Sequence, residues 1–354
     1  MPSSRSEQSP CCRSPRWLRR GITIGARLYL PEVLLVWLVL FVAGDRWYFA
    51  TLMLFGPRWL YAAPLAVLVP AAAWFQRRLL WPLAVSALVA IGPLMGLCLP
   101  WGRCGSVAGP SLRVLTCNVK GHCRDNAVLN VLIRETAPDL VALQGCWHSV
   151  KVNWPTGWQV RQEGEVLVAS RYPLRDAEPA PFVKDHGRRS RTDLMHCVVE
   201  APFAEFHFAA LHLPSIHEGI SEVLDRSTLI RPSRSNSMAV SIAVRRRASE
   251  DVSRWISGFS EAVIVAGDLN MPTDSTIYRA CWDQLSNAFS NSGFGFGYTE
   301  WPTIRDWRFG IRIDHVLSGP AWRPRRCWVG PDVGSDHLPL IADLVWTGPA
   351  REKQ

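Results

Sequence analysis

The stretch VIVAGDLN, residues 263–270, joins a short apolar run to a group of polar residues. Val263 to Ala266 are small or β-branched and apolar, which predicts a buried strand. The run ends in Gly267-Asp268, and Asn270 follows directly after Leu269. Open α/β sheets carry their binding and catalytic side chains where strands end. This stretch therefore predicts a sheet whose rim presents a carboxylate and an amide.

Similar strand-type runs alternate with helix-type segments through the rest of the C-terminal region. The predicted strands are residues 112–118, 139–144, 166–169, 195–199, 206–211, 263–266, 311–317 and 338–346. Helical spacing predicts helices over 127–136 and 237–259, and the basic run Arg245 to Arg247 in the second is interpreted as a solvated face. This alternation predicts a single α/β domain.

Asn118 and His212 lie at the ends of two other strand-type runs, and Asp314 and the pair Asp336-His337 come near the end of the chain. Taken singly each is weak, because a lone histidine is usually structural and Asp-Leu-Asn usually forms a turn. Together, carboxylates, amides and imidazoles suit the hydrolysis of a phosphate ester. A hard cation takes oxygen ligands, a water must lose a proton, and charge growing on phosphate oxygens needs donors.

The order of these motifs resembles the endonuclease/exonuclease/phosphatase superfamily, which includes deoxyribonuclease-I-like nucleases, neutral sphingomyelinases and inositol-phosphate phosphatases. The matching motifs are the strand ending at Asn118, Pro138–Gln144, Ser170–Leu174, Leu211–Leu213, Gly267–Asn270, Arg312–His315 and Ser335–Pro339. The resemblance implies an α/β fold built as a two-sheet, four-layer sandwich of deoxyribonuclease-I type. It also resembles a bacterial subgroup in which membrane spans precede this domain.

The resemblance also implies catalytic roles. Asp268 would orient and activate the attacking water, and Asn270 beside it would bind water or phosphate. His212 would donate to a phosphate oxygen. His337 would stabilise the pentavalent transition state, held in its tautomer by Asp314.

Asn118 and Asp336 would help to hold Mg²⁺ or Mn²⁺. The family normally places a glutamate, its principal metal carboxylate, after the Leu-Gln that ends a strand, but here Gly145 follows. Glycine offers no ligand, and Glu163 or Glu165 is a candidate replacement. The alternative function is a membrane-tethered pseudoenzyme that binds a phosphorylated or protein ligand without turnover.

Two further groups are candidates for substrate contact. The loop Gly293–Pro302 is expected beside the site, where its aromatic residues would contact an apolar or planar group or pack under the sheet. Arg188, Arg189 and Arg191 would attract phosphate or simply solvate the surface.

The N-terminal region contains three apolar runs, Leu28–Gly44, Trp59–Phe75 and Leu79–Leu99. Their length and spacing predict transmembrane helices. Arginines precede the first run, and Arg77-Arg78 separates the second from the third, so both basic segments should be cytoplasmic. Three spans then place the α/β domain outside the cytoplasm. The stretch Trp47–Phe55 is an alternative span or partial insertion that would move the domain inside.

The net charge of +9 therefore fits membrane orientation better than a nucleic-acid surface. The ten cysteines form no CxxC pair or zinc-type cluster, and we expect mostly buried thiols.

The predicted organisation is a basic cytoplasmic tail at 1–27, a transmembrane region at 28–101, a linker at 102–111, the α/β domain at 112–347 and a polar tail at 348–354. The predicted function is a membrane-anchored, metal-dependent phosphoester hydrolase of phosphodiesterase or nuclease type. Its candidate substrates are lipid headgroups, nucleic acid and small phosphoesters, with the lipid bilayer as a partner.

Overall fold

The computed structural model describes residues 16–100, 108–120, 126–146, 150–176, 193–216, 235–259, 262–304 and 307–349. The chain divides into two compact units. The first comprises Met1–Leu38 and Arg58–Gly96, and the second comprises Val39–Pro57 and Leu97–Gln354. The segment after the first apolar helix therefore belongs to the same unit as the C-terminal sheets.

The first unit is helical. Its elements are α1 (Arg16–Ala43, whose last residues belong to the second unit), η1 (Arg58–Tyr61), α3 (Leu65–Phe75), η2 (Arg77–Leu79), α4 (Leu80–Val89) and η3 (Ala90–Leu94). Three helical stretches are long and apolar enough to cross a membrane: Arg16–Ala43, Arg58–Phe75 and Arg77–Leu94. The three predicted apolar helices are thus confirmed in length and composition.

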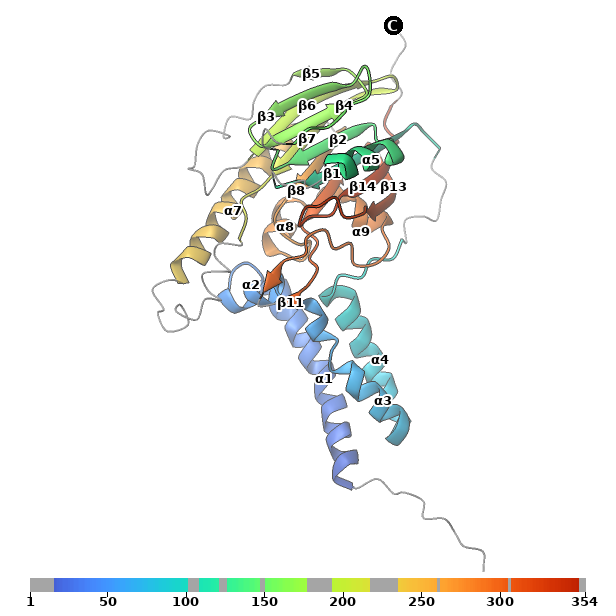
Figure 1. Cartoon of the computed structure of the whole chain (residues 1–354). Coiled ribbons are helices and arrows are strands. Elements are labelled where there is room, and N and C mark those ends of the chain that lie inside the picture. The colour runs from blue at the N-terminus through green and yellow to red at the C-terminus, as the bar shows by residue number, and fades with distance from the viewer. Residues whose placement is uncertain are drawn as a thin grey trace, which may run out of the picture. The chain divides into compact units, whose positions relative to one another are not determined.

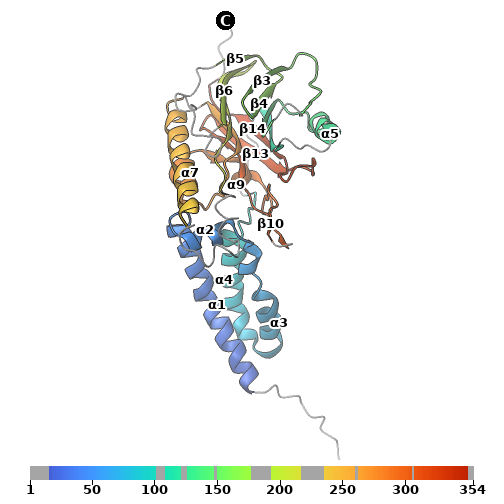
Figure 2. The same cartoon turned by 60° about the vertical axis from the view of Figure 1, so that its left-hand side comes forward.

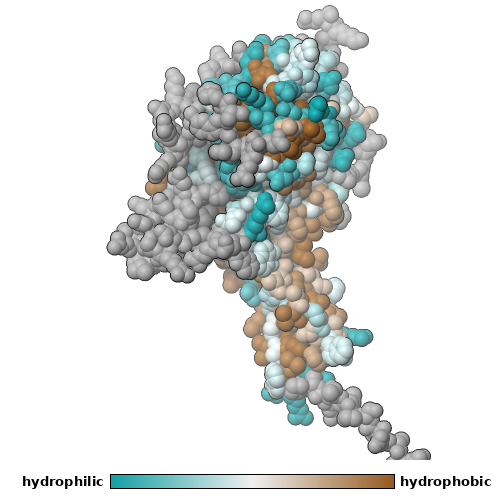
Figure 3. Space-filling model, viewed as in Figure 1, coloured by the Kyte–Doolittle hydropathy of each residue, from teal (hydrophilic) through white to brown (hydrophobic). Residues whose placement is uncertain are grey.

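Large apolar side chains cover the outside of these helices, as the brown surface in Figure 3 shows. Trp74 is 82% exposed and Trp81 77%, and Leu28, Val67 and Leu88 are also exposed. A helix of a water-soluble domain buries its apolar stripe. Exposed apolar surface of this kind is typical of a membrane environment.

The stretch Trp47–Phe55 is not a further span. It forms α2 (Tyr48–Phe55), a helix of only 8 residues, and lies within the second unit. A transmembrane helix needs about 20 apolar residues.

The second unit contains two six-stranded mixed sheets (Figures 1 and 2). The first has the order β13-β14-β1-β2-β4-β3 and the second the order β5-β6-β7-β8-β12-β9. The strands of the first are β1 (Ser111–Asn118), β2 (Leu140–Gln144), β3 (Gln159–Glu163), β4 (Val166–Ser170), β13 (Trp322–Val329) and β14 (Leu340–Trp346). Those of the second are β5 (Leu174–Asp176), β6 (Asp193–Ala201), β7 (Ala204–His212), β8 (Val263–Asp268), β9 (Ser286–Asn287) and β12 (Asp314–Ser318).

Alternating side chains of the two sheets meet in one core. Val114 and Ala142 of the first sheet and Phe208 and Ile264 of the second belong to the same buried cluster. The opposite faces are covered by helices: α5 (Asn126–Thr136) packs on the first sheet, and α7 (Ser235–Ile256) and α8 (Thr276–Cys281) pack on the second. This arrangement confirms the predicted four-layer sandwich. The helix α9 (Ala288–Ser292) and the ribbon of β10 (Thr303–Ile304) and β11 (Trp307–Arg308) complete the unit.

The basic run Arg245 to Arg247 differs from its prediction at one position. Arg247 is exposed as expected, but the Arg245 side chain is completely buried. Its guanidinium donates to Asp45 Oδ1 at 2.8 Å and to the carbonyl of Asn270 at 2.7 Å. The solvated-face interpretation is therefore wrong for Arg245, because its partner lies in a distant segment of the sequence.

The cysteines of the described residues are buried or partly buried. Cys117, Cys146, Cys197, Cys281 and Cys327 are buried and Cys98 is partly buried, as predicted for this part of the chain.

Candidate active site

The strand registers bring the predicted site residues to one rim of the sandwich. Parallel β7 and β8 place His212 beside Asp268, and antiparallel β12 places Asp314 on the other side of Asp268. In the first sheet, parallel β1 and β2 end together at Asn118 and Gln144. The two sheets meet here, because Asn118 Nδ2 donates to Asp268 Oδ2 at 2.9 Å.

Asp268 lies at the centre of this cluster and is 1% exposed. Its carboxylate accepts hydrogen bonds from the Asn270 backbone N–H at 2.8 Å and from Asn270 Nδ2 at 3.2 Å. Asn270 adopts a left-handed φ of 52°, which asparagine tolerates better than most residues. Burial and the nearby Asp314 carboxylate raise the pKa of Asp268, whereas His337 and His212 lower it by a smaller amount. A raised pKa suits a carboxylate that accepts a proton near neutral pH.

His337 and Asp314 form a buried pair. His337 Nδ1–H donates to Asp314 Oδ2 at 2.8 Å, and His337 Nε2 lies 3.9 Å from Asp268 Oδ2. Burial lowers the pKa of His337, but Asp314, Asp268 and Glu300 together raise it to about 9. The imidazole is therefore protonated at neutral pH and presents Nε2–H as a donor.

A second buried histidine, His315, differs from His337 in its hydrogen bonds and in the direction of its pKa shift. Its Nε2 donates to the carbonyl of Met271 at 2.9 Å, and its Nδ1 accepts from Asn287 Nδ2 at 3.0 Å. Burial, with Arg312 nearby, lowers the pKa of His315 to about 4. This imidazole is neutral and structural.

The two histidines predict a stability optimum near neutral pH. The raised pKa of His337 stabilises the fold below about pH 6.5, and this contribution is lost as pH rises through about 9. The lowered pKa of His315 stabilises the fold above about pH 6.5, and this contribution is lost as pH falls towards about 4. Each histidine thus gives the pH profile of the unfolding free energy one sloping arm, acidic for His315 and alkaline for His337. Each arm amounts to roughly 3 kcal/mol at about 1.4 kcal/mol per pKa unit.

Thermal unfolding of the full chain in detergent between about pH 5 and pH 9.5 measures both arms. We expect His315→Gln to flatten the acidic arm and His337→Gln the alkaline arm. Arms of unchanged slope in both variants would contradict the assignment.

The sequence did not single out two charged residues that contact this cluster. Glu300 is 3% exposed, and its Oε1 lies 3.6 Å from His337 Nε2. Lys120 Nζ lies 3.7 Å from that same oxygen and donates to Asp336 Oδ2 at 2.6 Å. Glu300 lies in the loop expected beside the site, whereas no pattern in the sequence marked Lys120.

Asp336 thus reaches the cluster through Lys120. Its carboxylate is 47% exposed, and the charge that binds it comes from another strand end. The structure brings all the other predicted residues together around Asp268 by direct contact or through His337. Arg188, Arg189 and Arg191 lie outside the described residues.

Glu165 lies beside His212. Glu165, Asp193 and His212 each offer one ligand atom, and these atoms lie within 4.8 Å of one another. Asp193 and His212 are paired across β6 and β7, and the Glu165 carbonyl accepts from the Cys146 N–H next to Gly145. Of the two glutamates proposed as replacements, Glu165 is the one in this cluster, while Glu163 is exposed at the end of β3.

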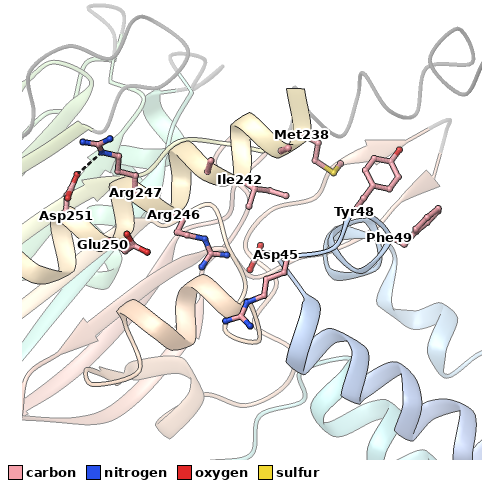
Figure 4. A pocket seen from close by; sticks show the side chains of 12 residues that line it. Asp45, Tyr48, Phe49, Met238, Ile242, Arg246, Arg247, Glu250 and Asp251 are labelled. Carbon is pink, nitrogen blue, oxygen red and sulfur yellow. Dashed lines mark ion pairs between the residues drawn. The ribbon is translucent and has the colours of Figure 1, made fainter. Parts of the chain in front are cut away.

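A cavity of about 860 Å³ lies elsewhere in the second unit, between α2 and α7 (Figure 4). It is lined by Asp45, Arg46, Tyr48 and Phe49 and by the face of α7 between Met238 and Asp251. None of its lining residues is a predicted site residue, so this cavity is separate from the cluster around Asp268.

The family model described as the endonuclease/exonuclease/phosphatase family matches residues 115–337, a span that includes every predicted site residue. The chain belongs to the endonuclease/exonuclease/phosphatase family. No curated protein sequence matches the chain.

Solved structures similar to this member of the family have low sequence identity to it. A family protein from Bacteroides thetaiotaomicron is 15% identical with a TM-score of 0.48, covering 68% of this chain and 99% of that one. TDP2 of D. rerio, complexed with a single-strand DNA product, is 17% identical with a TM-score of 0.47 and covers 66% and 98%. The 3′ phosphatase NExo from Neisseria, bound to a product DNA hairpin, is 19% identical with a TM-score of 0.47 and covers 66% and 100%.

Enzymes of the endonuclease/exonuclease/phosphatase family typically depend on a divalent metal, and two clusters here have suitable atoms. Asp268, Asp314 and His337 form one, in which His337 Nδ1 is already bonded to Asp314. Glu165, Asp193 and His212 form the other, which has a donor set compatible with a cation.

The predicted metal ligands Asn118 and Asp336 are both bonded within the protein. Asn118 Nδ2 donates to Asp268, and Asn118 Oδ1 accepts from the Lys120 N–H at 3.0 Å, which leaves that oxygen one further lone pair. Asp336 is bound to the Lys120 ammonium. Gly145 leaves the position of the usual carboxylate without a side chain. A divalent ion between Asn118 and Asp336 would have an ammonium group as its neighbour.

Proposed function

We propose that this chain is a membrane-anchored enzyme that hydrolyses phosphoesters at the rim around Asp268. The observation that carries the proposal is the contact between one buried carboxylate and two imidazoles, with Asp268 Oδ2 3.7 Å from His212 Nε2 and 3.9 Å from His337 Nε2. A proton acceptor and donors within one small space are what the hydrolysis of a phosphoester requires. Membership of the family supports the same reaction class.

Each residue of the cluster has its own role in the proposed reaction. Asp268, with its raised pKa, accepts a proton from the attacking water and orients that water with Asn270. The imidazolium of His337 donates from Nε2 to a phosphate oxygen as negative charge grows there, and Asp314 fixes its ring through Nδ1. His212 is half-buried on the same side and supplies a second donor to phosphate.

The substrate proposed is a phosphodiester or a related phosphoester. Lipid headgroups, nucleic acid and small phosphoesters all present the required group. The three apolar helices favour a lipid, because they would hold the site close to a bilayer. The arginines ahead of the apolar run Leu28–Gly44, and Arg77-Arg78, favour an extracytoplasmic position for the second unit. The family's usual cofactors are Mg²⁺ and Mn²⁺, for which Glu165, Asp193 and His212 are the available donor set.

The alternative is a pseudoenzyme that binds a phosphorylated ligand without turnover. One observation favours it, namely the lysine ammonium and the glycine at the rim where the family holds its metal.

Turnover by the full chain in detergent separates the two. We expect release of p-nitrophenol from bis-p-nitrophenyl phosphate, or of headgroup phosphate from mixed-micelle phospholipids, in many-fold molar excess over protein. Each assay is run with Mg²⁺, with Mn²⁺ and with chelator, so that both metal-dependent and metal-independent hydrolysis would be detected. The Asp268→Asn variant, prepared in the same way, gives the background rate. Saturable ligand binding with product below one equivalent under all conditions would establish the pseudoenzyme instead.

A further inference from the structure

The Lys120 ammonium lies in the most acidic part of the rim. Its Nζ donates to Asp336 Oδ2 at 2.6 Å and lies 3.7 Å from Glu300 Oε1. Asp268 is also close enough to influence its charge. The two carboxylates beside Lys120 favour the charged form of its side chain. The Lys120 side chain is 42% exposed, so its ammonium is accessible from solvent.

The backbone of Lys120 has an unusual conformation. Its φ is 41°, in the left-handed region that non-glycine residues adopt at a cost of about 1 kcal/mol or more. Such conformations persist where the surrounding structure requires them, and they are frequent at functional sites. Here the conformation lets the Lys120 N–H bind Asn118 Oδ1 while its side chain extends towards Asp336.

Gly145 leaves the space that the Lys120 backbone occupies in this conformation. A Cβ added at Gly145 would lie 2.8 Å from the Lys120 nitrogen, 2.9 Å from the Lys120 Cα and 2.8 Å from Asn118 Oδ1. All three contacts are closer than real Cβ atoms approach, and two of them are to backbone. The backbone of Lys120 therefore occupies the space of a side chain at position 145. The lost carboxylate and the gained ammonium are two parts of one arrangement.

The charges at the rim agree with this arrangement. Two carboxylates, Asp336 and Glu300, face a single ammonium, and His337 supplies a second positive charge towards Glu300 and Asp268. A divalent cation added between Asn118 and Asp336 would be repelled by Lys120 at short range. It would also lack the carboxylate that position 145 no longer supplies.

We propose that the Lys120 ammonium replaces the divalent cation at this rim, excludes such an ion from the space between Asn118 and Asp336, and binds a substrate phosphate oxygen in its place. The exclusion of metal stands on the geometry of Lys120 alone, and the contact with phosphate rests on the proposed function.

The first experiment measures metal binding directly, without substrate. Mn²⁺ is titrated into the full chain in detergent and the free ion is followed by electron paramagnetic resonance. Lys120→Met keeps the length of the side chain and removes its charge, so we expect it to bind one more Mn²⁺ per chain than the wild type. Lys120→Arg, which keeps the charge, should match the wild type. The double variant Lys120→Met/Asp336→Asn should lose the additional ion.

Lys151→Met is the matched control, because Lys151 is an exposed lysine of the same unit. A Mn²⁺ site that all variants share, such as the cluster of Glu165, Asp193 and His212, adds the same number of bound ions to each variant. It therefore does not affect the difference between them. Equal Mn²⁺ stoichiometry in wild type and Lys120→Met overturns the inference, whether or not any substrate is turned over.

The second experiment measures activity. In Mg²⁺ and in chelator, we expect Lys120→Met to lose about 10- to 100-fold in kcat/KM relative to the wild type, the effect of one charge-assisted hydrogen bond to phosphate. Equal kcat/KM values of wild type and Lys120→Met in the conditions that support hydrolysis overturn the role in phosphate binding. Absence of turnover in every condition would contradict both the proposed function and the role of Lys120 in phosphate binding. The Mn²⁺ titration would still test whether Lys120 excludes the metal.

Discussion

Hydrolysis by the Asp268→Asn variant is expected to be about 10³-fold slower than that of the wild type, with the loss in kcat. The amide has the same shape as the carboxylate but cannot accept a proton at any working pH. Its NH2 group also faces a donor in either orientation, Asn118 Nδ2 at the position of Oδ2 or the Asn270 N–H at the position of Oδ1. General base catalysis alone contributes about 10²- to 10⁴-fold, and an interaction used in the transition state lowers kcat more than it changes KM.

The matched control is Asp343→Asn. Asp343 is also a paired carboxylate on a strand, bound to Arg113 across β1 and β14, but it contacts none of the site residues. Steady-state kinetics of both variants on the same diester give the comparison. A kcat of Asp268→Asn within about 10-fold of the wild-type value would show that Asp268 is not the proton acceptor in the reaction. Similar losses in both variants would point to a general effect on folding.

Replacing Arg245 by methionine is expected to lower the free energy of unfolding by about 3–5 kcal/mol, the cost of breaking a buried ion pair by removing one partner. Both side chains of the pair are 0% exposed. Asp45 also accepts hydrogen bonds from Ser275 Oγ and from the backbone N–H of Ile277, at the start of α8. Without Arg245 this carboxylate would remain buried with an uncompensated charge. The Asn270 carbonyl would lose its donor as well.

Thermal unfolding in detergent measures this effect, with a decrease in Tm of roughly 10 °C expected. Arg247→Met is the control on the same helix, because Arg247 is 80% exposed and its ion pair with Asp251 has an N–O distance of 3.9 Å. The double variant Asp45→Asn/Arg245→Met should recover part of the loss, since neither charge remains. Equal Tm values for Arg245→Met and Arg247→Met would show that the buried pair adds nothing to stability.

The fold could be predicted from sequence because its main signals are local. Each central strand is a short apolar run followed at once by a polar residue, as at Asn118, His212 and Asp268. The predicted α/β sandwich is confirmed. The strand β13 was missed because its pattern is irregular: a register shift between Pro324 and Arg326 interrupts the alternation of buried and exposed residues.

The missed charged residues have no local signal. Arg245 appears within a basic run on an amphipathic helix, and nothing nearby shows that its partner is Asp45. Lys120 follows a recognised strand end, yet its contact with Asp336 depends on pairing between β1 and β14 at opposite ends of the domain. Glycine in place of the usual glutamate at position 145 was the one visible sign that the rim differs from the family pattern. The catalytic roles of the predicted residues stay predictions until the variants are measured.

The pair of Asp45 and Arg245 makes the catalytic unit depend on a segment that precedes the last two apolar helices. A protease that cut the chain just before Ser111 would liberate every strand and every predicted site residue, but the fragment would leave Asp45 behind. The liberated fragment would carry an uncompensated guanidinium behind the Asp268–Asn270 loop. We therefore expect the liberated fragment to be less stable than the full chain by about 3–5 kcal/mol.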